Sequence, residues 1–167
     1  MAVVATIFTS CVGIPDGVTA VQNFNKDKYL GKWYEIARFD FRFERNLDNT
    51  TAQYSINPDG SIKVLNQGYN YVKKEWDSAE GKAKFIGSES EARLKVSFFG
   101  TFYGGYNVVD IDENYQNALI YGNSTEYMWI LSRTKTIDEA TKKRFIEKAK
   151  KDGFDVSKLI WVNHNKD

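Results

Sequence analysis

Hydrophobic and polar residues alternate along most of the chain between Gly31 and Thr134, which is the pattern of antiparallel strands with one buried face. Residues 52–56 alternate in this way. They are followed by Asn57-Pro58-Asp59-Gly60, in which proline presets a turn and glycine accepts a positive φ. The same kind of segment recurs at intervals, at 33–41, 61–66, 81–85, 93–98, 106–110, 118–121 and 127–132. We therefore expect about eight strands joined in sequence.

A series of about eight up-and-down strands exposes two sheet edges unless the first strand pairs with the last. We therefore predict an all-β protein with one C-terminal α-helix, built as an eight-stranded antiparallel up-and-down β-barrel. A barrel of about this size either fills with side chains or holds one small ligand.

One helix is predicted after the last barrel strand. Thr136 or Asp138 can cap its start, and Gly153 can end it. Its apolar residues form one stripe and the rest of its surface is charged, which indicates a helix packed on the outside of the barrel. Residues 159–162 follow as a last short strand.

The composition narrows the function classes. The 23 basic and 22 acidic residues leave a net charge of +1 without a basic stripe, so no nucleic-acid partner is expected. One Cys and one His exclude an internal disulfide and a Cys-rich zinc site, and neither a metal nor a cofactor is expected. An acyl-transfer enzyme needs a nucleophile with a base in reach. The barrel segment has no Cys, and His164 follows the last strand, so we do not expect an enzyme.

The N-terminal residues 2–8 are mostly apolar and precede Thr9-Ser10-Cys11. Small residues before a Cys resemble the end of a bacterial lipoprotein signal, in which the Cys is lipidated. The stretch is shorter than a usual signal and has no Lys or Arg, so an N-terminal tail with an incidental Cys is the alternative. We expect residues 1–17 to be signal remnant, lipidation site and tether, and residues 18–167 to be the barrel with its helix and last strand.

Three short motifs resemble the signatures of the lipocalins. Gly31-Lys32-Trp33-Tyr34 matches the first, Gly-x-Trp-Tyr at the start of an eight-stranded meander. The segment 110–115 lies where the lipocalins have the turn of their second signature. Arg133 follows the last barrel strand, where the third lipocalin signature has its arginine. Residues 33–45, 95–108, 129–134 and 153–158 are similar to the bacterial lipocalins, outer-membrane lipoproteins related to apolipoprotein D. The likeness covers about residues 18–163.

The resemblance implies a role for each signature residue. In lipocalins the Trp closes the narrow end of the barrel and the Arg stacks across its ring, so Gly31, Trp33, Tyr34 and Arg133 are expected to be structural. The resemblance also implies a lipid anchor on Cys11 and a location at the outer membrane, facing the periplasm.

The ligand is expected inside the barrel. If Trp33 points inward, period two gives a mostly apolar and aromatic lining. The predicted ligand-binding residues are Ala37, Phe39, Tyr54, Ile56, Ile62, Val64, Asn66, Ala83, Phe85, Leu94, Val96, Phe98, Tyr106, Val108, Trp129 and Leu131. Small residues such as Ala37, Gly81 and Ala83 favour a pocket, and a filled core is the alternative.

Such a lining suits an acyl chain, so a fatty acid or a lysophospholipid is the expected ligand. Arg42 and Arg45 are expected at the mouth as partners for its head group, and Phe41, Phe43 and Tyr103 as its apolar lip. A pigment, a tetrapyrrole or an aromatic effector is the alternative ligand, although the barrel lacks the His that most often binds haem. A homodimer that buries an aromatic rim also stays open.

Overall fold

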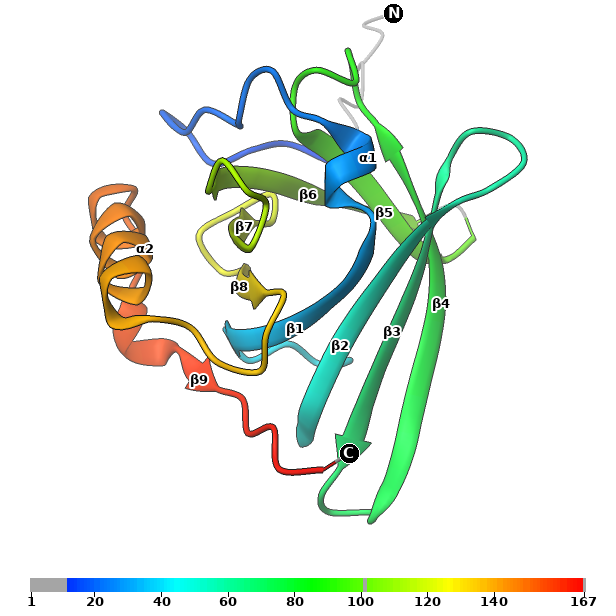
Figure 1. Ribbon diagram of the computed structural model, residues 1–167, viewed down its shortest axis with the longest axis vertical. Coiled ribbons are helices and arrows are strands. Elements are labelled where there is room, and N and C mark those ends of the chain that lie inside the picture. Colours follow the sequence, from blue (N-terminus) through cyan, green and yellow to red (C-terminus); the bar gives the residue numbers. More distant parts are fainter. Residues whose placement is uncertain (1–11, 101, 167) are drawn as a thin grey trace, which may run out of the picture.

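The computed structural model describes residues 12–100 and 102–166, and its main element is an antiparallel sheet that closes on itself (Figure 1). Eight strands follow one another around a barrel, and pairing between β1 and β2 closes it. These strands are β1 Gly31–Arg38, β2 Leu47–Ile56, β3 Ile62–Asn70, β4 Glu75–Phe85, β5 Arg93–Phe99, β6 Phe102–Ile111, β7 Asn117–Tyr121 and β8 Met128–Ser132. A short ninth strand, β9 (Ile160–Trp161), adds to β1. The predicted barrel is confirmed.

The predicted helix is α2 (Glu139–Lys151), which lies on the outside of the barrel (Figure 1). Asp138 caps it, because its side chain accepts a hydrogen bond of 2.9 Å from the backbone N–H of Thr141. Gly153 follows its end with a φ of +91°. Two shorter helical turns, α1 (Lys26–Tyr29) and η1 (Val156–Lys158), were not predicted.

Buried side chains form two clusters that the barrel wall separates. The inner cluster includes Trp33, Tyr54 and Val108 and fills part of the barrel interior. The outer cluster joins β1, β7 and β8 to α2 through Phe145 and Ala149, both fully buried. The strands between the two clusters, such as residues 118–121, are therefore apolar on both faces, whereas the far strands keep one polar face.

The inward position predicted for Ala37 and Phe39 was wrong. A β-bulge between Glu35 and Ala37 shifts the register of β1 against β8. Because a bulge adds one residue, the two faces of the strand exchange beyond it. Ala37 and Phe39 therefore pack in the outer cluster against α2. The side chain of Arg38 points inward instead, and this residue is 2% exposed.

The first described residues lie against the barrel wall. The Asn107 amide donates a hydrogen bond of 3.1 Å to the carbonyl oxygen of Gly13. A Cβ on Gly105 would lie only 2.7 Å from the same oxygen, so this close approach needs a glycine. Ile14 packs on the outer cluster, and Pro15 is buried. The segment predicted as a tether is thus in contact with β6 from Gly13 onward, and Cys11 lies outside the described residues.

Two classes of feature are absent from residues 12–100 and 102–166. No helix there is both long enough and apolar enough to cross a bilayer. No group of three His, Cys, Asp or Glu side chains there is placed to hold a metal ion.

Candidate ligand-binding site

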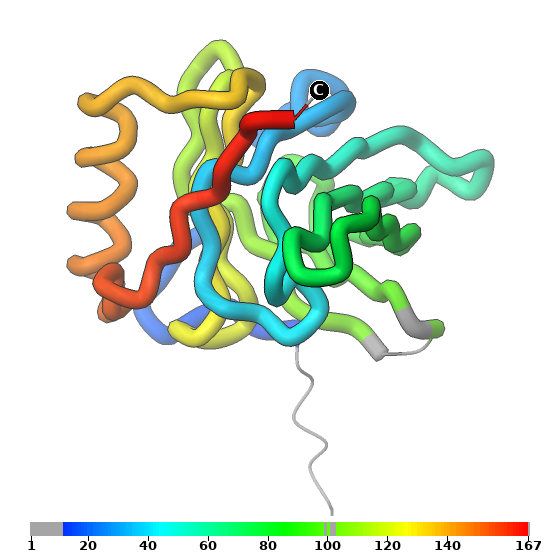
Figure 2. The backbone as a smooth tube through the Cα atoms, turned by 90° about the horizontal axis from the view of Figure 1, so that it is seen from below, coloured from blue at the N-terminus to red at the C-terminus, as the bar shows by residue number. Residues whose placement is uncertain are grey.

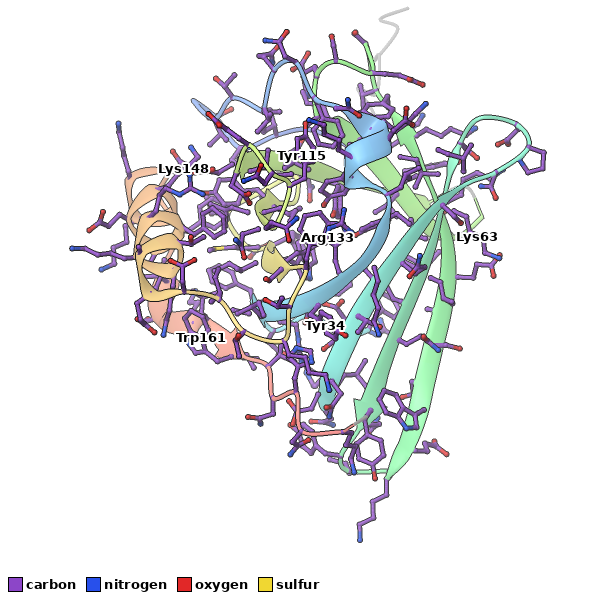
Figure 3. The ribbon with its side chains drawn as sticks, viewed as in Figure 1. Tyr34, Lys63, Tyr115, Arg133, Lys148 and Trp161 are labelled. Carbon is purple, nitrogen blue, oxygen red and sulfur yellow. The ribbon has the colours of Figure 1, made fainter. Side chains whose placement is uncertain are left out.

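One end of the barrel is closed by a tryptophan under an arginine. Trp33 is fully buried, and the guanidinium carbon of Arg133 lies 3.8 Å from the centre of its ring. Figure 3 shows Arg133 across this end of the barrel, with Tyr115 beside it. The guanidinium also donates hydrogen bonds of 2.8 to 3.2 Å to the carbonyl oxygens of Lys28, Tyr29, Leu30, Lys32 and Tyr115. This geometry agrees with the structural role expected for the pair.

The other two signature residues support this closed end from outside. Gly31 has a φ of +96°, and a Cβ there would lie 3.3 Å from a guanidinium nitrogen of Arg133. Tyr34 faces away from the interior, and its ring meets the edge of the His164 ring at 5.4 Å. The His164 ring donates a hydrogen bond of 2.8 Å to the carbonyl oxygen of Glu35. Burial lowers the pKa of His164, so the neutral ring is favoured.

Three tyrosine hydroxyls meet above the closed end. The Tyr106 hydroxyl lies 2.6 Å from that of Tyr29 and 2.9 Å from that of Tyr54. Burial raises the pKa of all three phenols, so they stay protonated and act as hydrogen-bonding groups. The floor of the barrel interior is therefore aromatic, with neutral polar groups that partner one another.

Most predicted lining residues lie together on the inner face. Buried in the inner cluster are Tyr54, Ile62, Val64, Ala83, Leu94, Val108 and Leu131. Partly buried and packed against it are Phe85, Val96, Phe98, Tyr106 and Trp129. A side chain that points inward and is still partly exposed must face space that solvent can enter. The inner face is therefore closed around the first group and accessible to solvent at part of the second, which includes Val96, Phe98 and Trp129.

The accessible space is clearest beside Val96. This residue lies between Ala83 on β4 and Gly104 on β6 in the paired strands. A Cβ built on Gly104 meets no described heavy atom within 4 Å, so the described residues leave the space in front of Gly104 open. The opposite holds at Gly81, where a Cβ would lie 2.8 Å from the Phe98 ring. Two glycines on the wall thus have different functions, one leaving space and one accommodating a ring.

Ile56 and Asn66 depart from the rest of the predicted lining. Ile56 is the last residue of β2, beside the turn to β3, and it stays 43% exposed because no further element covers that strand end. Asn66 pairs with Ala52, a member of the inner cluster. Its side-chain oxygen is buried and accepts no hydrogen bond from the described residues. Buried polar atoms are usually paired, so this oxygen is available to a ligand hydroxyl or to water.

Four aromatic rings gather at the open end of the barrel. The Phe41 ring centre lies 5.4 Å from that of Phe43, 5.7 Å from that of Tyr127 and 6.2 Å from that of Trp129. The indole N–H of Trp129 donates a hydrogen bond of 2.9 Å to the carboxylate of Glu44. We call Phe41, Phe43, Tyr127 and Trp129 the mouth cluster. It joins the β1–β2 loop to β8 and lies next to the accessible inner residues.

A buried ion pair lies below the mouth cluster. Arg38 donates a hydrogen bond of 2.9 Å to the Glu35 carboxylate, and both side chains are less than a tenth exposed. Arg38 also donates to the carbonyl oxygens of Glu44 and Leu47, at 2.8 and 3.0 Å, which ties down the β1–β2 loop. Burial raises the pKa of Glu35 most strongly, and the nearby Glu44 raises it further, against the opposing effect of Arg38.

The two arginines predicted at the mouth have different surroundings. Arg42 is exposed, and its guanidinium carbon lies 5.5 Å from the centre of the Phe43 ring. Arg45 instead makes a two-pronged ion pair with Asp40, with a shortest distance of 2.7 Å. The hydrogen bond from Arg45 lowers the pKa of Asp40. Arg42 is thus the more available of the two for an anionic head group.

Tyr103 lies on the outer surface instead of on the lip of the mouth. The Lys95 ammonium stands 4.9 Å from the centre of its ring. Lys95 comes between Leu94 and Val96, which both pack on the inner cluster, so its side chain leaves the opposite face of β5. The sequence placed Tyr103 near the open end correctly but on the wrong face of the strand.

Two clefts lie outside the barrel, along the C-terminal segment. One, of about 400 Å³, contains the Asp40–Arg45 ion pair and Trp161. The other, of about 450 Å³, is lined by His164 and Trp76 together with the lysines Lys32, Lys135 and Lys166. Neither contains a residue of the inner cluster, so both are separate from the interior site.

Three residues at the open end were not predicted as site residues: Arg38, Glu44 and Tyr127. Arg38 had a visible signal, since it is the only charged residue in the run from Ile36 to Phe39. A charge within a buried strand points to a partner, here Glu35. Glu44 and Tyr127 lie on loops, where no periodicity indicates direction.

Comparison with known proteins gives consistent results for a family model and for individual relatives. The family described as lipocalin-like domain matches residues 24–164. The outer membrane lipoprotein Blc of Citrobacter freundii is 56% identical over 148 residues, which cover 89% of this chain and 84% of that protein. The protein of the same name from Vibrio cholerae is 48% identical and covers 95% of this chain and 93% of its own length.

A solved structure adds evidence on the fold alone. Insecticyanin from the tobacco hornworm Manduca sexta superimposes with a TM-score of 0.71 over 90% of this chain and 86% of that chain, at 20% sequence identity.

Proposed function

The chain belongs to the lipocalin family, and from that premise we propose that it binds one fatty acid or lysophospholipid inside the barrel while a lipid on Cys11 anchors it to the outer membrane. The family and the fold are those of binding proteins. Binding, rather than catalysis, is therefore the function we assign.

The observation that carries the proposal is the open interior beside Val96 and Gly104. It is bounded by apolar and aromatic side chains, among them Phe98 and Trp129, that are only partly buried. A lining of this composition suits an acyl chain better than a charged or sugar-like molecule.

Burial of an acyl chain supplies enough free energy for binding. Each buried methylene contributes about 0.8 kcal/mol, so ten contribute on the order of 8 kcal/mol before the cost of immobilising the ligand. Affinity in the micromolar range then requires no strong polar anchor. The head group would lie at the mouth, near the exposed Arg42.

The anchor is supported by the relatives and by the sequence around Cys11. The proteins from Citrobacter freundii and Vibrio cholerae are both named outer membrane lipoproteins. Small residues precede Cys11, and Val12 follows it. One acyl chain binds a membrane only marginally, whereas several hold stably. We propose that the barrel faces the periplasm from this anchor.

A planar, non-lipid ligand such as a pigment or a tetrapyrrole is the second candidate. The observation that favours it is the set of aromatic rings at both ends of the interior, including Tyr54 and Trp129. Such rings stack on flat molecules. A visible absorbance band in the purified protein would support this candidate over lipid.

The test is a titration of the delipidated Cys11→Ser chain with a lysophospholipid and with a long-chain fatty acid. Tryptophan fluorescence would follow binding, and native mass spectrometry would count ligands and protein copies. We expect saturable binding of one lipid per chain with a Kd in the micromolar range. If neither lipid binds, the barrel is a filled core or takes another ligand. The same spectra test the homodimer that the sequence leaves open.

A further inference from the structure

The first described residues leave the barrel at its open end. Gly13 is held by Asn107, whose amide also donates a hydrogen bond of 3.1 Å to the carbonyl oxygen of Gly122, where the β7–β8 loop begins. In Figure 2 the blue N-terminal segment, the yellow β7–β8 loop and the β1–β2 loop share the lower edge of the molecule, and α1 lies at the upper edge. The point from which the chain continues toward Cys11 is therefore beside the mouth.

The distance from this point to the anchor is short. Cys11 precedes Gly13 by two residues, which span at most about 7 Å when extended. Because Gly13 is fixed on β6, a lipid attached at Cys11 has no long tether. A bilayer that holds this lipid must then lie against the open end of the barrel, not against its closed end.

The open end also has the side chains that suit a bilayer surface. Phe43 is 55% exposed, and Arg42 lies against its ring. Phenylalanine with a neighbouring arginine suits a membrane surface, where the ring enters the apolar layer and the charge stays at the phosphates. Two nearby acids are already partnered, Asp40 by Arg45 and Glu44 by Trp129, and Glu126 remains exposed.

The closed end differs in each of these respects. Its β2–β3 turn is Asn57-Pro58-Asp59-Gly60, and its β4–β5 loop contains the polar residues Ser88, Glu89 and Ser90. Most of these residues are exposed. Its exposed large hydrophobic side chains, Ile56 and Ile86, are aliphatic and are 43% and 39% exposed.

We infer that the mouth cluster docks on the lipid bilayer that carries the anchor, so that the barrel opens directly onto the membrane. This inference rests on the proposed function, which supplies both the anchor on Cys11 and a ligand of membrane origin. It adds an orientation and a contact surface. A lipid that moves from the bilayer into the barrel then passes Phe43 and Trp129 and does not cross bulk water.

The experiment couples Cys11 of the full chain to a maleimide lipid in vesicles of phosphatidylethanolamine and phosphatidylglycerol, and measures amide hydrogen exchange. The reference is the same chain with Cys11 capped by a maleimide without lipid. We expect exchange in residues 41–45 and 122–127 to slow at least fivefold, and exchange in residues 57–60 to stay the same. Unchanged exchange at the mouth, or slowing at 57–60 instead, would overturn the inference.

Two matched variants test the side chains. Phe43→Glu places a charge at the mouth, and Ile86→Glu places the same charge on an exposed side chain of the closed end. We expect Phe43→Glu to abolish most of the slowing at 122–127, and Ile86→Glu to leave it unchanged. Full slowing in Phe43→Glu would contradict the docking surface. Both positions are exposed, so both variants should fold, which a thermal melt checks.

The chemical anchor separates this inference from the proposed function. If cells do not lipidate Cys11, the mass of the purified protein shows it, and the exchange experiment is unaffected because its lipid is attached in vitro. If the barrel binds no lipid, the titration of the Cys11→Ser chain shows it. Slowed exchange at the mouth in either case would still support the docking surface.

Discussion

The two ends of the barrel are built from the same strands but use their side chains in opposite ways. At the closed end Trp33 is fully buried, and Arg133 satisfies five carbonyl oxygens while covering its ring. At the open end, inward-facing residues such as Val96 and Trp129 stay partly exposed, and a Cβ on Gly104 would meet no heavy atom of the described residues within 4 Å. The first end stabilises the fold, and the second is where we propose that the ligand binds.

This difference explains why the family signatures do not mark the binding site. Gly31, Trp33 and Arg133 all belong to the closed end, where one arrangement covers the Trp33 ring and satisfies five carbonyl oxygens. The open end needs only apolar walls of suitable size, and many sequences provide those. The predictions below test this division, in order of decreasing effect.

The largest effect is expected from Arg133→Ala. The variant uncovers Trp33 and leaves several carbonyl oxygens without a donor, so the free energy of unfolding should fall by about 2–4 kcal/mol. Urea unfolding measures this, and lipid affinity should change little. Arg144→Ala is the control, because its ion pair with Asp110 is long at 3.4 Å and partly exposed, and should change stability by less than about 0.5 kcal/mol. If Arg133→Ala weakened lipid binding at unchanged stability, the assignment of the closed end to stability and of the open end to binding would be contradicted.

The next effect is expected from Val96→Lys at the open end. The charge would lie against the acyl chain and should weaken lipid binding more than tenfold, about 1.4 kcal/mol or more, while the barrel still folds. The control is Gln53→Lys, at an exposed position of β2 whose neighbours Ala52 and Tyr54 face inward. Equal affinity in a folded Val96→Lys variant would show that the ligand binds elsewhere.

A pair of glycine variants contrasts the two ends directly. Gly31→Ala places a Cβ at a positive φ and 3.3 Å from Arg133, and should cost about 1 kcal/mol of stability. Gly104→Ala adds a methyl group in open space, so it should leave stability unchanged and alter lipid affinity instead. Thermal melts and titrations of both variants check this. If both variants changed stability and lipid affinity in the same way, the distinction between the closed end and the open end would be lost.

The sequence predicted the closed end better than the open end, and β1 shows why. Period two correctly placed Trp33 inward, because the strand is regular up to that point. The bulge after Glu35 has no marker in the sequence, since neither glycine nor proline lies there. The prediction was therefore wrong for Ala37 and Phe39, which follow the bulge.

The loops at the mouth show a second limit. Phe41 and Tyr127 are far apart in sequence and meet only because β1 and β8 pair. Directions of loop side chains follow from such long-range packing, not from local periodicity. Tyr103 directly precedes Gly104 and Gly105. The sequence predicted it near the correct loop but on the inner side of the mouth, whereas its ring lies on the outer face with Lys95.

The smallest effect concerns pH and a residue outside both ends. Burial lowers the pKa of His164, so its contribution to stability is fully present above its unfolded pKa of about 6.5 and is lost as the pH falls through the lower folded value. Urea midpoints should therefore decrease below pH 6.5 more steeply in the wild type than in His164→Gln. Parallel curves would mean that the His164 contact with Glu35 does not contribute.

The most direct test of the lipid-binding interior uses the four tryptophans, because each lies in a different region. Trp33 lies at the closed end, Trp129 at the mouth, and Trp76 and Trp161 each line one of the outer clefts. Proton–nitrogen NMR resolves one indole N–H signal for each. On saturation with lysophospholipid we predict a large shift of the Trp129 signal together with the Val96 and Gly104 amides, and little change at the others. Shifts confined to Trp76 or Trp161 would place the ligand outside the barrel and contradict the proposal.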